Sequence, residues 1–384
     1  MENQHRAQTS TRVAFLIAGI GFSTLAPLIP GIKDRLALTD SALGLLLLCV
    51  GLGSIVVMPF AGGLAARFSC QKVIIVSAIA LIASLPWVTL APNTVSLALA
   101  LALLGAGGGT LDVVMNIQAV VVERDSQRPM MSGFHGMFSV GGIVGAGGLT
   151  ALLSLKLTPF VGQSIIAAAC IVMLIAVAPN LLPRQESAEE NKPKSFALPR
   201  GKVLLLGTLC LIVFMAEGSV TDWSGVLLAD YRHVALAHAG LGYVAFAAMM
   251  TLNRLTGDKV VAKLGRRAIM LGGCLIAALG FVLSAAVVFA PIDILGFAMV
   301  GIGLANVVPI LFTATGSQDD MPANLALSSV TTMGYLGLLL GPPMLGFIAH
   351  QTSLLVSLTT LGALCIGVAA CTAKVTGHDL AKHG

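Results

Sequence analysis

The chain has 384 residues, of which 57% are hydrophobic and 10% charged, and its mean hydropathy is +0.94. Soluble domains carry about 25% charged residues, so this composition excludes an ordinary water-soluble protein and indicates one that uses lipid as its solvent. The net charge of +5 comes from basic residues scattered over short polar segments, which argues against nucleic-acid binding. The seven cysteines include no CxxC pair, so we expect neither a disulfide framework nor a zinc site, and no cofactor.

Apolar runs of about 20 residues, long enough to cross roughly 30 Å of hydrocarbon, recur along the chain. They predict an all-α membrane protein with twelve transmembrane helices. The first run has no small-residue cleavage site, so it is expected to be a span and not a signal peptide. The twelve spans are expected at about 12–32, 42–66, 73–91, 95–122, 132–154, 160–178, 202–228, 239–256, 268–290, 292–316, 325–348 and 352–373.

The longest polar segment separates spans 6 and 7. It predicts a cytoplasmic linker at 179–201 between two six-helix bundles, at 1–178 and 202–384. Cytoplasmic loops carry an excess of Lys and Arg, and with both termini inside, the external segments hold only Lys33, Arg35, Lys156 and Arg232. We therefore expect a multi-pass protein of the bacterial inner membrane with both termini in the cytoplasm.

The two halves repeat at a constant offset of 196 residues. Gly105 matches Gly301, and the same offset relates Gly107 to Gly303, Ser132 to Ser328, Gly141 to Gly337 and Gly145 to Gly341. Parallel six-span repeats are typical of a large class of transporters, whose substrate site lies near the membrane midplane between the halves. The glycines themselves are better explained by close helix packing than by a ligand.

The loop between spans 2 and 3, GGLAARFSCQK at 62–72, and the loop between spans 8 and 9, GDKVVAKLGRR, resemble the G-x-L-a-D-R-x-G-R-R motif of the major facilitator superfamily. Together with the 6+6 repeat, this resemblance covers the whole chain and implies the pseudo-symmetric fold of two six-helix bundles. In that family the motif clamps the cytoplasmic gate. Alanine stands at the acidic position of both copies, and Asp258 could substitute in the second. The gate residues implied here are Arg67, Arg254, Asp258, Lys263 and Arg266.

Within the superfamily, the segments DVVMNIQ, SGFHGMFSVGG and FMAEGSVTDWSG look most like the YbjJ-type inner membrane proteins, distant relatives of fucose–proton symporters. Those symporters carry acidic residues in spans 1 and 4. Span 4 of this chain has Asp112, but span 1 has no acid, and span 7 carries Glu217 instead, at the position related to Gly21 by the repeat. The resemblance therefore leaves fucose itself in doubt as the substrate.

Three polar residues stand out in spans 4 and 5. Asp112 and Asn116 are four residues apart and share a helix face, and His135 lies about one turn into the next span. Ionisable groups inside a membrane are expensive and are functional by default. We interpret Asp112 as a proton-accepting carboxylate and His135 as a proton relay. The structural alternative is a packing bridge, with Asp112 tied to His135 or Arg254, or His135 bonded to Asp112 or Asn116.

Span 7 carries Glu217, about four turns from its start and close to mid-membrane. It is the first choice for the coupling proton, against a structural hydrogen bond, and Gly218 and Ser219 are expected to weaken the helix there. Asp222 and Trp223 lie nearer the outer face. Trp223 could stack on a sugar ring, although tryptophan is also enriched at membrane interfaces, and the interfacial anchor is slightly favoured.

Three further residues could line a cavity. Asn306 precedes Pro309 in span 10, and Tyr335 in span 11 could donate to a substrate hydroxyl or pack in the core. Arg254 could pair with Asp258 four residues later or reach inward, and we favour the first. The candidate substrate-binding set is Asn116, Asn306, Trp223, Tyr335 and Asp222.

Four functions fit these observations to different degrees. The first is a proton-driven secondary transporter, acting as a monomer on a small neutral sugar or polyol, or on a cationic compound. The second is a proton-driven exporter of drugs or other cationic or apolar compounds. An intramembrane enzyme would need a nucleophile–base or metal cluster, and only the lone His135 lies within a span, so we expect no enzymatic activity. A transport-inactive receptor or scaffold is the fourth.

Overall fold

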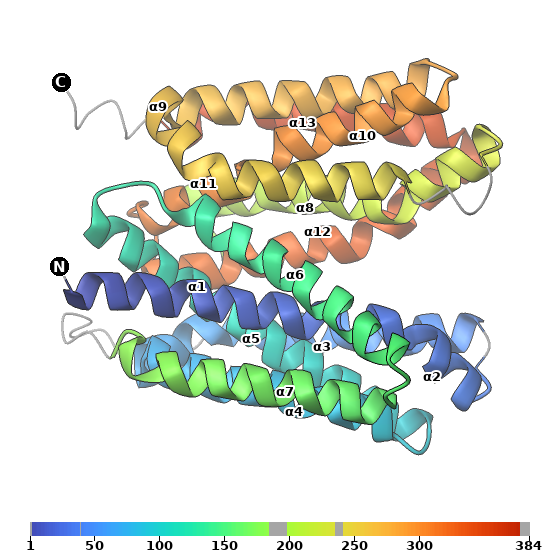
Figure 1. Ribbon diagram of the computed structural model, residues 1–384. Helices are drawn as coiled ribbons and strands as arrows, with labels where there is room; N and C mark the ends of the chain where they lie inside the picture. The colour runs from blue at the N-terminus through green and yellow to red at the C-terminus, as the bar shows by residue number, and fades with distance from the viewer. Residues whose placement is uncertain (1, 39, 184–197, 235–240, 377–384) are drawn as a thin grey trace. The chain divides into compact units, whose positions relative to one another are not determined.

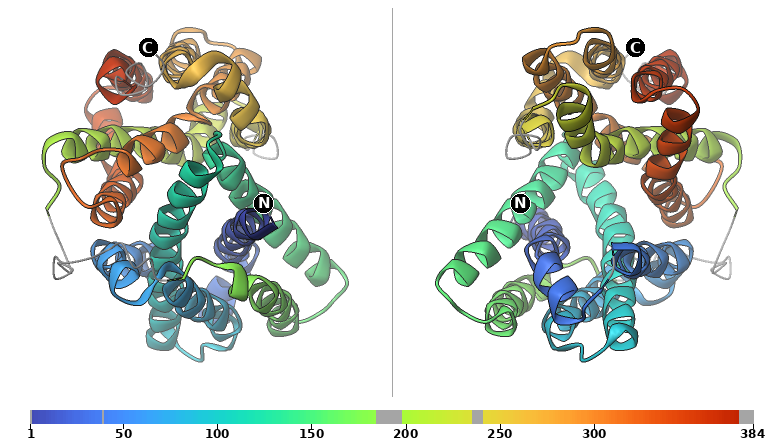
Figure 2. Two further views of the ribbon diagram at one scale, coloured as in Figure 1. Left: turned by 90° about the vertical axis from the view of Figure 1, so that its left-hand side faces the viewer. Right: turned by 90° about the vertical axis from the view of Figure 1, so that its right-hand side faces the viewer.

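The structure is a computed structural model that describes residues 2–38, 40–183, 198–234 and 241–376. These residues form helices and no strand. The chain divides into two compact units: unit 1 comprises Met1–Gln127, Phe134–Leu198 and Pro322–Ser329, and unit 2 comprises Arg128–Gly133, Pro199–Met321 and Val330–Gly384. Most of the predicted linker, 184–197, lies outside the described residues. Figure 2 shows most helices of each unit nearly end on.

The helices of unit 1 surround one long central helix, α5. That helix packs against α1, α3 and α4, and α7 packs against α1 and α4 (Figure 1). Asn93 caps the start of α5, because its side chain accepts a hydrogen bond from the Ser96 backbone nitrogen. The elements of unit 1 are α1 (Glu2–Ser23), η1 (Ala26–Leu28), α2 (Ile29–Arg35), α3 (Asp40–Phe68), α4 (Cys70–Leu90), α5 (Thr94–Ser126), α6 (Met131–Ser154), α7 (Pro159–Val177) and η2 (Ala178–Asn180).

Unit 2 is organised around α9, which packs against α8, α10 and α13. The α6 helix begins in unit 2 and continues in unit 1, whereas α12 begins in unit 1 and continues in unit 2. The elements of unit 2 are α8 (Gly201–Val226), the π-helical turn η3 (Leu227–Tyr231), α9 (Leu241–Ala286), α10 (Ala290–Leu304), α11 (Val307–Gly316), α12 (Ala323–Gln351), α13 (Leu354–Ala370) and α14 (Thr372–Thr376).

Eleven helical segments among the described residues are long and apolar enough to cross a membrane. One of them, α9, has 46 residues and contains the non-helical Gly265, with φ at 80°. At 1.5 Å per residue such a segment is about twice the thickness of a bilayer. It therefore contains most of predicted spans 8 and 9, so the expected all-helical membrane fold is confirmed and the expected count of twelve spans is nearly matched. The helix continues past residue 256, the predicted end of span 8, to the Gly265 break.

The 196-residue repeat holds in the packing as well as in the sequence. A Cβ on Gly105 would collide with the backbone oxygen of Val50, and one on Gly301 would collide with that of Phe246. Val50 and Phe246 are themselves 196 residues apart. The two glycines thus make the same close backbone approach in each unit, as expected for small residues at membrane helix interfaces.

A buried ion pair ties three elements of unit 2 together. Arg232, just after η3, donates from Nε to Asp293 Oδ2 at 2.8 Å, and the two side chains are only 4% and 0% exposed. Its Nη2 also donates to the carbonyl oxygen of Ser284 at 3.0 Å, near the end of α9. The sequence alone placed Arg232 in an external loop and did not predict this pair.

Substitution at Gly105 should test the close approach. Gly105→Ala adds a methyl group where the Val50 carbonyl lies, and overpacking of this kind costs about 1–3 kcal/mol. We expect a lower unfolding temperature for the purified protein in detergent. Gly142→Ala is the control, because nothing lies within 4 Å of a Cβ at that position. Equal unfolding temperatures for the two variants would contradict the packing role.

Removing one partner of the buried pair should be worse than removing both. Arg232→Leu leaves the Asp293 carboxylate buried without its cation, a change that typically costs about 3–5 kcal/mol. The double change Arg232→Leu with Asp293→Leu should recover part of that loss in thermal unfolding. Arg124→Ala is the control, since its pair with Asp125 is exposed, with side chains 65% and 56% accessible. If the double variant is as unstable as the sum of the two single variants, the pair is not coupled.

Candidate functional site

The polar residues of spans 4 and 5 come together inside unit 1. Asn116 donates from Nδ2 to the backbone oxygen of Asp112 at 2.8 Å, and its Nδ2 lies 3.4 Å from Asp112 Oδ1. Asn116 Oδ1 is 3.1 Å from Nε2 of His135 on α6. All three residues are buried, and Asn116 is fully so. The predicted bond between His135 and Asn116 is present, and Asn116 stands between His135 and Asp112.

Aromatic side chains enclose this cluster. The ring of Phe15, on α1, meets the His135 ring edge-on at 5.2 Å and stacks on Phe134 at 5.8 Å. The Arg12 guanidinium lies 5.9 Å from the Phe134 ring centroid, within the range of a cation–π contact. Phe15 and Arg12 carry no signal in the sequence beyond their place in the first span, so they could not be predicted as neighbours of His135.

In unit 2, Glu217 and Arg254 form an ion pair. Nη2 of Arg254 donates to Oε1 and Oε2 of Glu217 at 3.3 and 3.4 Å, and the two side chains are 10% and 13% exposed. Nε of the same guanidinium donates to the backbone oxygen of Ala305 at 3.2 Å. Arg254 therefore has a partner on α8, Glu217, which the sequence did not single out.

The carbonyl that Arg254 contacts lies at a break in the tenth span. Helix α10 ends at Leu304 and α11 begins at Val307, so Ala305 and Asn306 form a turn that interrupts the helix. The α8 helix, by contrast, runs without interruption past Glu217. The expectation that Gly218 and Ser219 weaken α8 was wrong: the Ser219 hydroxyl donates to the Met215 carbonyl at 2.5 Å within a continuous helix. The local break belongs to span 10.

Asn306 and Asp258 lie on either side of Gly257. The Oδ1 atom of Asn306 is packed where a Cβ on Gly257 would stand, and Asn306 is 6% exposed. Asp258 Oδ2 accepts a hydrogen bond from the backbone nitrogen of Gly133 at 2.9 Å. Asp258 thus binds the backbone near the start of α6. This contact was not part of the gating role predicted for Asp258.

The remaining substrate-binding candidates are Tyr335 on α12 and Asp222 and Trp223 on α8. The ring of Tyr335, on α12, is 6.1 Å from that of Phe214, one turn before Glu217. Asp222 is exposed, and Trp223 is half-buried with its Nε1 atom enclosed. Tyr335 is thereby placed near the Glu217 turn of the helix, while Asp222 and Trp223 lie more than one turn beyond it.

The basic residues predicted for the gate lie at helix ends. Arg67 is exposed near the end of α3, with its guanidinium 5.2 Å from the Phe68 ring centroid. Lys263 is exposed and Arg266 half-buried, on either side of the Gly265 break in α9. Arg67 and Lys263 are as exposed as residues of a loop would be.

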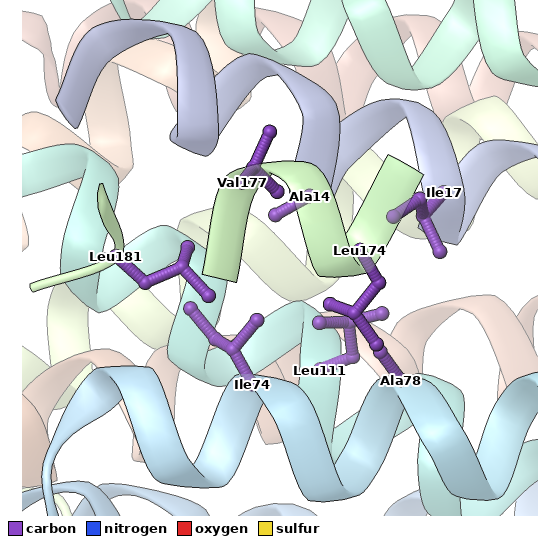
Figure 3. A pocket seen from close by; sticks show the side chains of 8 residues that line it. All are labelled: Ala14, Ile17, Ile74, Ala78, Leu111, Leu174, Val177 and Leu181. Atoms are coloured by element: carbon purple, nitrogen blue, oxygen red, sulfur yellow. The ribbon is translucent and has the colours of Figure 1, made fainter. Parts of the chain in front are cut away.

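A pocket in unit 1 lies between α1, α4, α5 and α7 (Figure 3). Its lining is wholly apolar, so it offers a polar solute nothing to bind, and we interpret it as part of the packing. The lining residues are Ala14, Ile17, Ile74, Ala78, Leu111, Leu174, Val177 and Leu181. Among the described residues, no group of three His, Cys, Asp or Glu side chains could hold a metal ion.

Comparisons with known proteins identify the family. The sequence pattern of the Major Facilitator Superfamily matches residues 13–319. An uncharacterized MFS-type transporter of Yersinia pestis is 48% identical over 369 residues, which cover 96% of each chain.

Two solved structures share the fold at low sequence identity. The human organic anion transporter MFSD10 superposes with a TM-score of 0.79 at 13% identity, covering 96% of this chain and 99% of that one. The E. coli fucose:proton symporter FucP superposes with a TM-score of 0.78 at 16% identity, covering 96% and 97%. The family pattern covers most of the chain, and the similarity to the Yersinia pestis relative covers 96% of it. This multi-pass membrane protein therefore belongs to the Major Facilitator Superfamily.

Proposed function

We propose that this protein moves a small neutral solute, a sugar or a polyol, across the membrane together with protons, and that Glu217 carries the coupled proton. One observation supports the proposal above the others: the Arg254 guanidinium contacts both the Glu217 carboxylate and the Ala305 carbonyl at the break in span 10. A proton on Glu217 removes the negative charge that balances Arg254. Because Arg254 also donates to the Ala305 carbonyl, the loss of charge on Glu217 would alter the contact of Arg254 with the break in span 10.

The geometry of the pair suits a bond that must open. Charge-assisted N–H···O bonds are usually 2.7–2.9 Å long, and a strong arginine pair uses two nitrogens in a fork. Here one nitrogen serves both carboxylate oxygens at 3.3 and 3.4 Å. In the low dielectric of a membrane, neutralising Glu217 is the event that most changes the local energy. We infer that this step permits the alternating movement of the two halves.

The charge balance of unit 2 favours a neutral substrate. Arg254 is already balanced by Glu217, and a neutral polyhydroxyl solute can approach such a pair without bringing an unmatched charge into the membrane. Hydroxyl groups both donate and accept, which suits the neighbouring Tyr335 and the amide of Asn306. Asp222 and Trp223 would meet the solute nearer the external end. In unit 1, Asn116 is the candidate for binding the solute, and Asp112 and His135 are candidates for carrying a proton.

Several finer features complete the proposal. The protein acts as a monomer in the bacterial inner membrane, with both termini in the cytoplasm and no enzymatic activity. It falls in the YbjJ-type branch of the superfamily. Arg67, Lys263 and Arg266 help to close the cytoplasmic side, with Asp258 supplying the acidic group that the loop motifs lack.

A ligand screen followed by flux measurement tests the function. Thermal-shift assays with sugars, polyols, amines and apolar drugs identify a ligand, and proteoliposomes containing a pH-sensitive dye then report proton movement on its addition. We expect a sugar or polyol to move protons inward. Proton-coupled export of amines or apolar drugs would favour the exporter alternative, and the absence of both ligand binding and proton flux would favour a transport-inactive receptor.

Glu217→Gln separates coupling from binding. The amide keeps the shape of the side chain but cannot release a proton, so proton-driven accumulation should fall to the level of empty liposomes while solute exchange without a gradient persists. Asp125→Asn is the control, since it neutralises an exposed acid at the end of α5. Wild-type accumulation by Glu217→Gln would exclude this residue as the coupling site.

Arg254→Lys tests the link to the helix break. Lysine keeps the positive charge for Glu217 but lacks the planar fork that reaches two acceptors at once. We expect the unfolding temperature to change by only a few degrees, while the proton-driven rate drops roughly tenfold, as for the loss of one hydrogen bond to a charged group. A full wild-type rate would show that the Ala305 contact is not part of the cycle.

A further inference from the structure

The hydrogen-bond directions around Asn116 follow from chemistry alone. A backbone carbonyl can only accept, so the group 2.8 Å from the Asp112 oxygen must be the amide nitrogen of Asn116. The amide oxygen then faces His135 Nε2 at 3.1 Å, and it too can only accept. The shared hydrogen must therefore lie on Nε2. Choosing the other amide orientation would set two acceptors against each other at Asp112.

We propose that Asn116 is a positioning residue that holds His135 in its Nε2–H tautomer. A carboxamide that donates at one end and accepts at the other cannot hand a proton across without becoming an imidic acid. Asn116 thus determines which of its neighbours donates and which accepts a hydrogen bond, but it does not transfer a proton. Any second proton on the ring binds at Nδ1, because Nε2 is already occupied.

The surroundings make this arrangement rigid. Asn116 has no exposed surface, so bulk water does not compete for its amide. Phe15 packs edge-on against the imidazole at 5.2 Å, which fixes the plane of the ring. The Asp112 carboxylate on α5 belongs to the cluster, and the Arg12 guanidinium of α1 lies over the Phe134 ring.

The Asn116 amide lies between His135 and Asp112, and it does not itself pass a proton from one to the other. Their use in transport rests on the proposed function, whereas the tautomer itself does not depend on whether the protein transports anything.

Nuclear magnetic resonance of the histidine side chains tests the tautomer directly. The full-length protein, labelled with ¹⁵N only in its seven histidines, is placed in lipid nanodiscs without any solute. Long-range proton–nitrogen spectra distinguish Nε2–H from Nδ1–H rings, and the His135 signals are those lost in His135→Phe. We expect one neutral species with Nε2–H and a slowly exchanging ring proton. A wild-type ring with its hydrogen on Nδ1, or a mixture of the two, overturns the proposal.

Variants at position 116 provide the causal test. Asn116→Leu removes the acceptor, so the ring should show both neutral tautomers and its proton should exchange roughly tenfold faster, as expected for one lost buried hydrogen bond. Asn116→Asp keeps an oxygen facing the ring and should retain hydrogen on Nε2. If Asn116→Leu does not fold, Asn116→Asp still tests whether an oxygen at this position keeps the hydrogen on Nε2.

The matched control is Gln118→Leu, which removes an equally buried amide from the same helix, one bonded to Thr11 and to the Leu182 backbone. Its His135 spectrum should equal that of the wild type. An Asn116→Leu spectrum identical to wild type would refute the positioning role. Failure of the Glu217→Gln flux prediction would leave these spectra unaffected, so the two proposals can fail independently.

Discussion

A guanidinium inside a membrane helix needs a partner, and this requirement shapes unit 2. Removing Arg254 from water costs several kcal/mol, which only close anionic and polar groups offset. Glu217 and the Ala305 carbonyl supply them. The carbonyl is available because span 10 is interrupted between α10 and α11, where the backbone cannot satisfy itself within a helix. The ion pair and the helix break therefore depend on each other: the break supplies an acceptor, and the arginine satisfies a carbonyl that would otherwise be stranded in an apolar environment.

The internal repeat shows which parts of the molecule are architecture. Gly105 and Gly301 make the same backbone approach in the two units, so the duplicated glycines encode helix packing. The charged pair is not duplicated. At the offset of 196, Glu217 and Arg254 correspond to Gly21 and Met58. A Cβ on Gly21 would collide with the Leu81 side chain, which would have to move to admit an acid at this position, and Met58 is fully buried. Acid and base are present together in one unit and absent together in the other, as expected for residues that need each other.

Composition and apolar run length predict the helical membrane fold well, because a bilayer leaves the backbone few alternatives. The sequence also identifies Asp112, Asn116, His135 and Glu217, since a polar group in an apolar span is conspicuous on its own. Partners are harder to predict, because they depend on how helices rotate and pack. Asp258 was the favoured partner of Arg254 because it is four residues away on the same helix, and the pattern of the sequence did not pair Arg254 with Glu217 on α8, 37 residues earlier. The continuous α8 at Gly218 has a similar explanation: tertiary packing overrides the weak helix propensity of a single glycine.

The two polar clusters differ in what a proton would change. In unit 2, a proton on Glu217 turns a balanced pair into an unbalanced cation, so the electrostatic energy of the interior changes sharply. In unit 1, Asn116 links its neighbours through neutral hydrogen bonds at 2.8 and 3.1 Å, and an amide keeps the same donor and acceptor ends whatever the charge beside it. The repeat again separates the roles, since Asp112, Asn116 and His135 correspond to Val308, Phe312 and Thr331. Each unit therefore carries a polar cluster at positions that are largely apolar in the other. A duplicated scaffold has in this way acquired two chemically different sites, one suited to respond to a proton and one suited to hold its hydrogen bonds fixed.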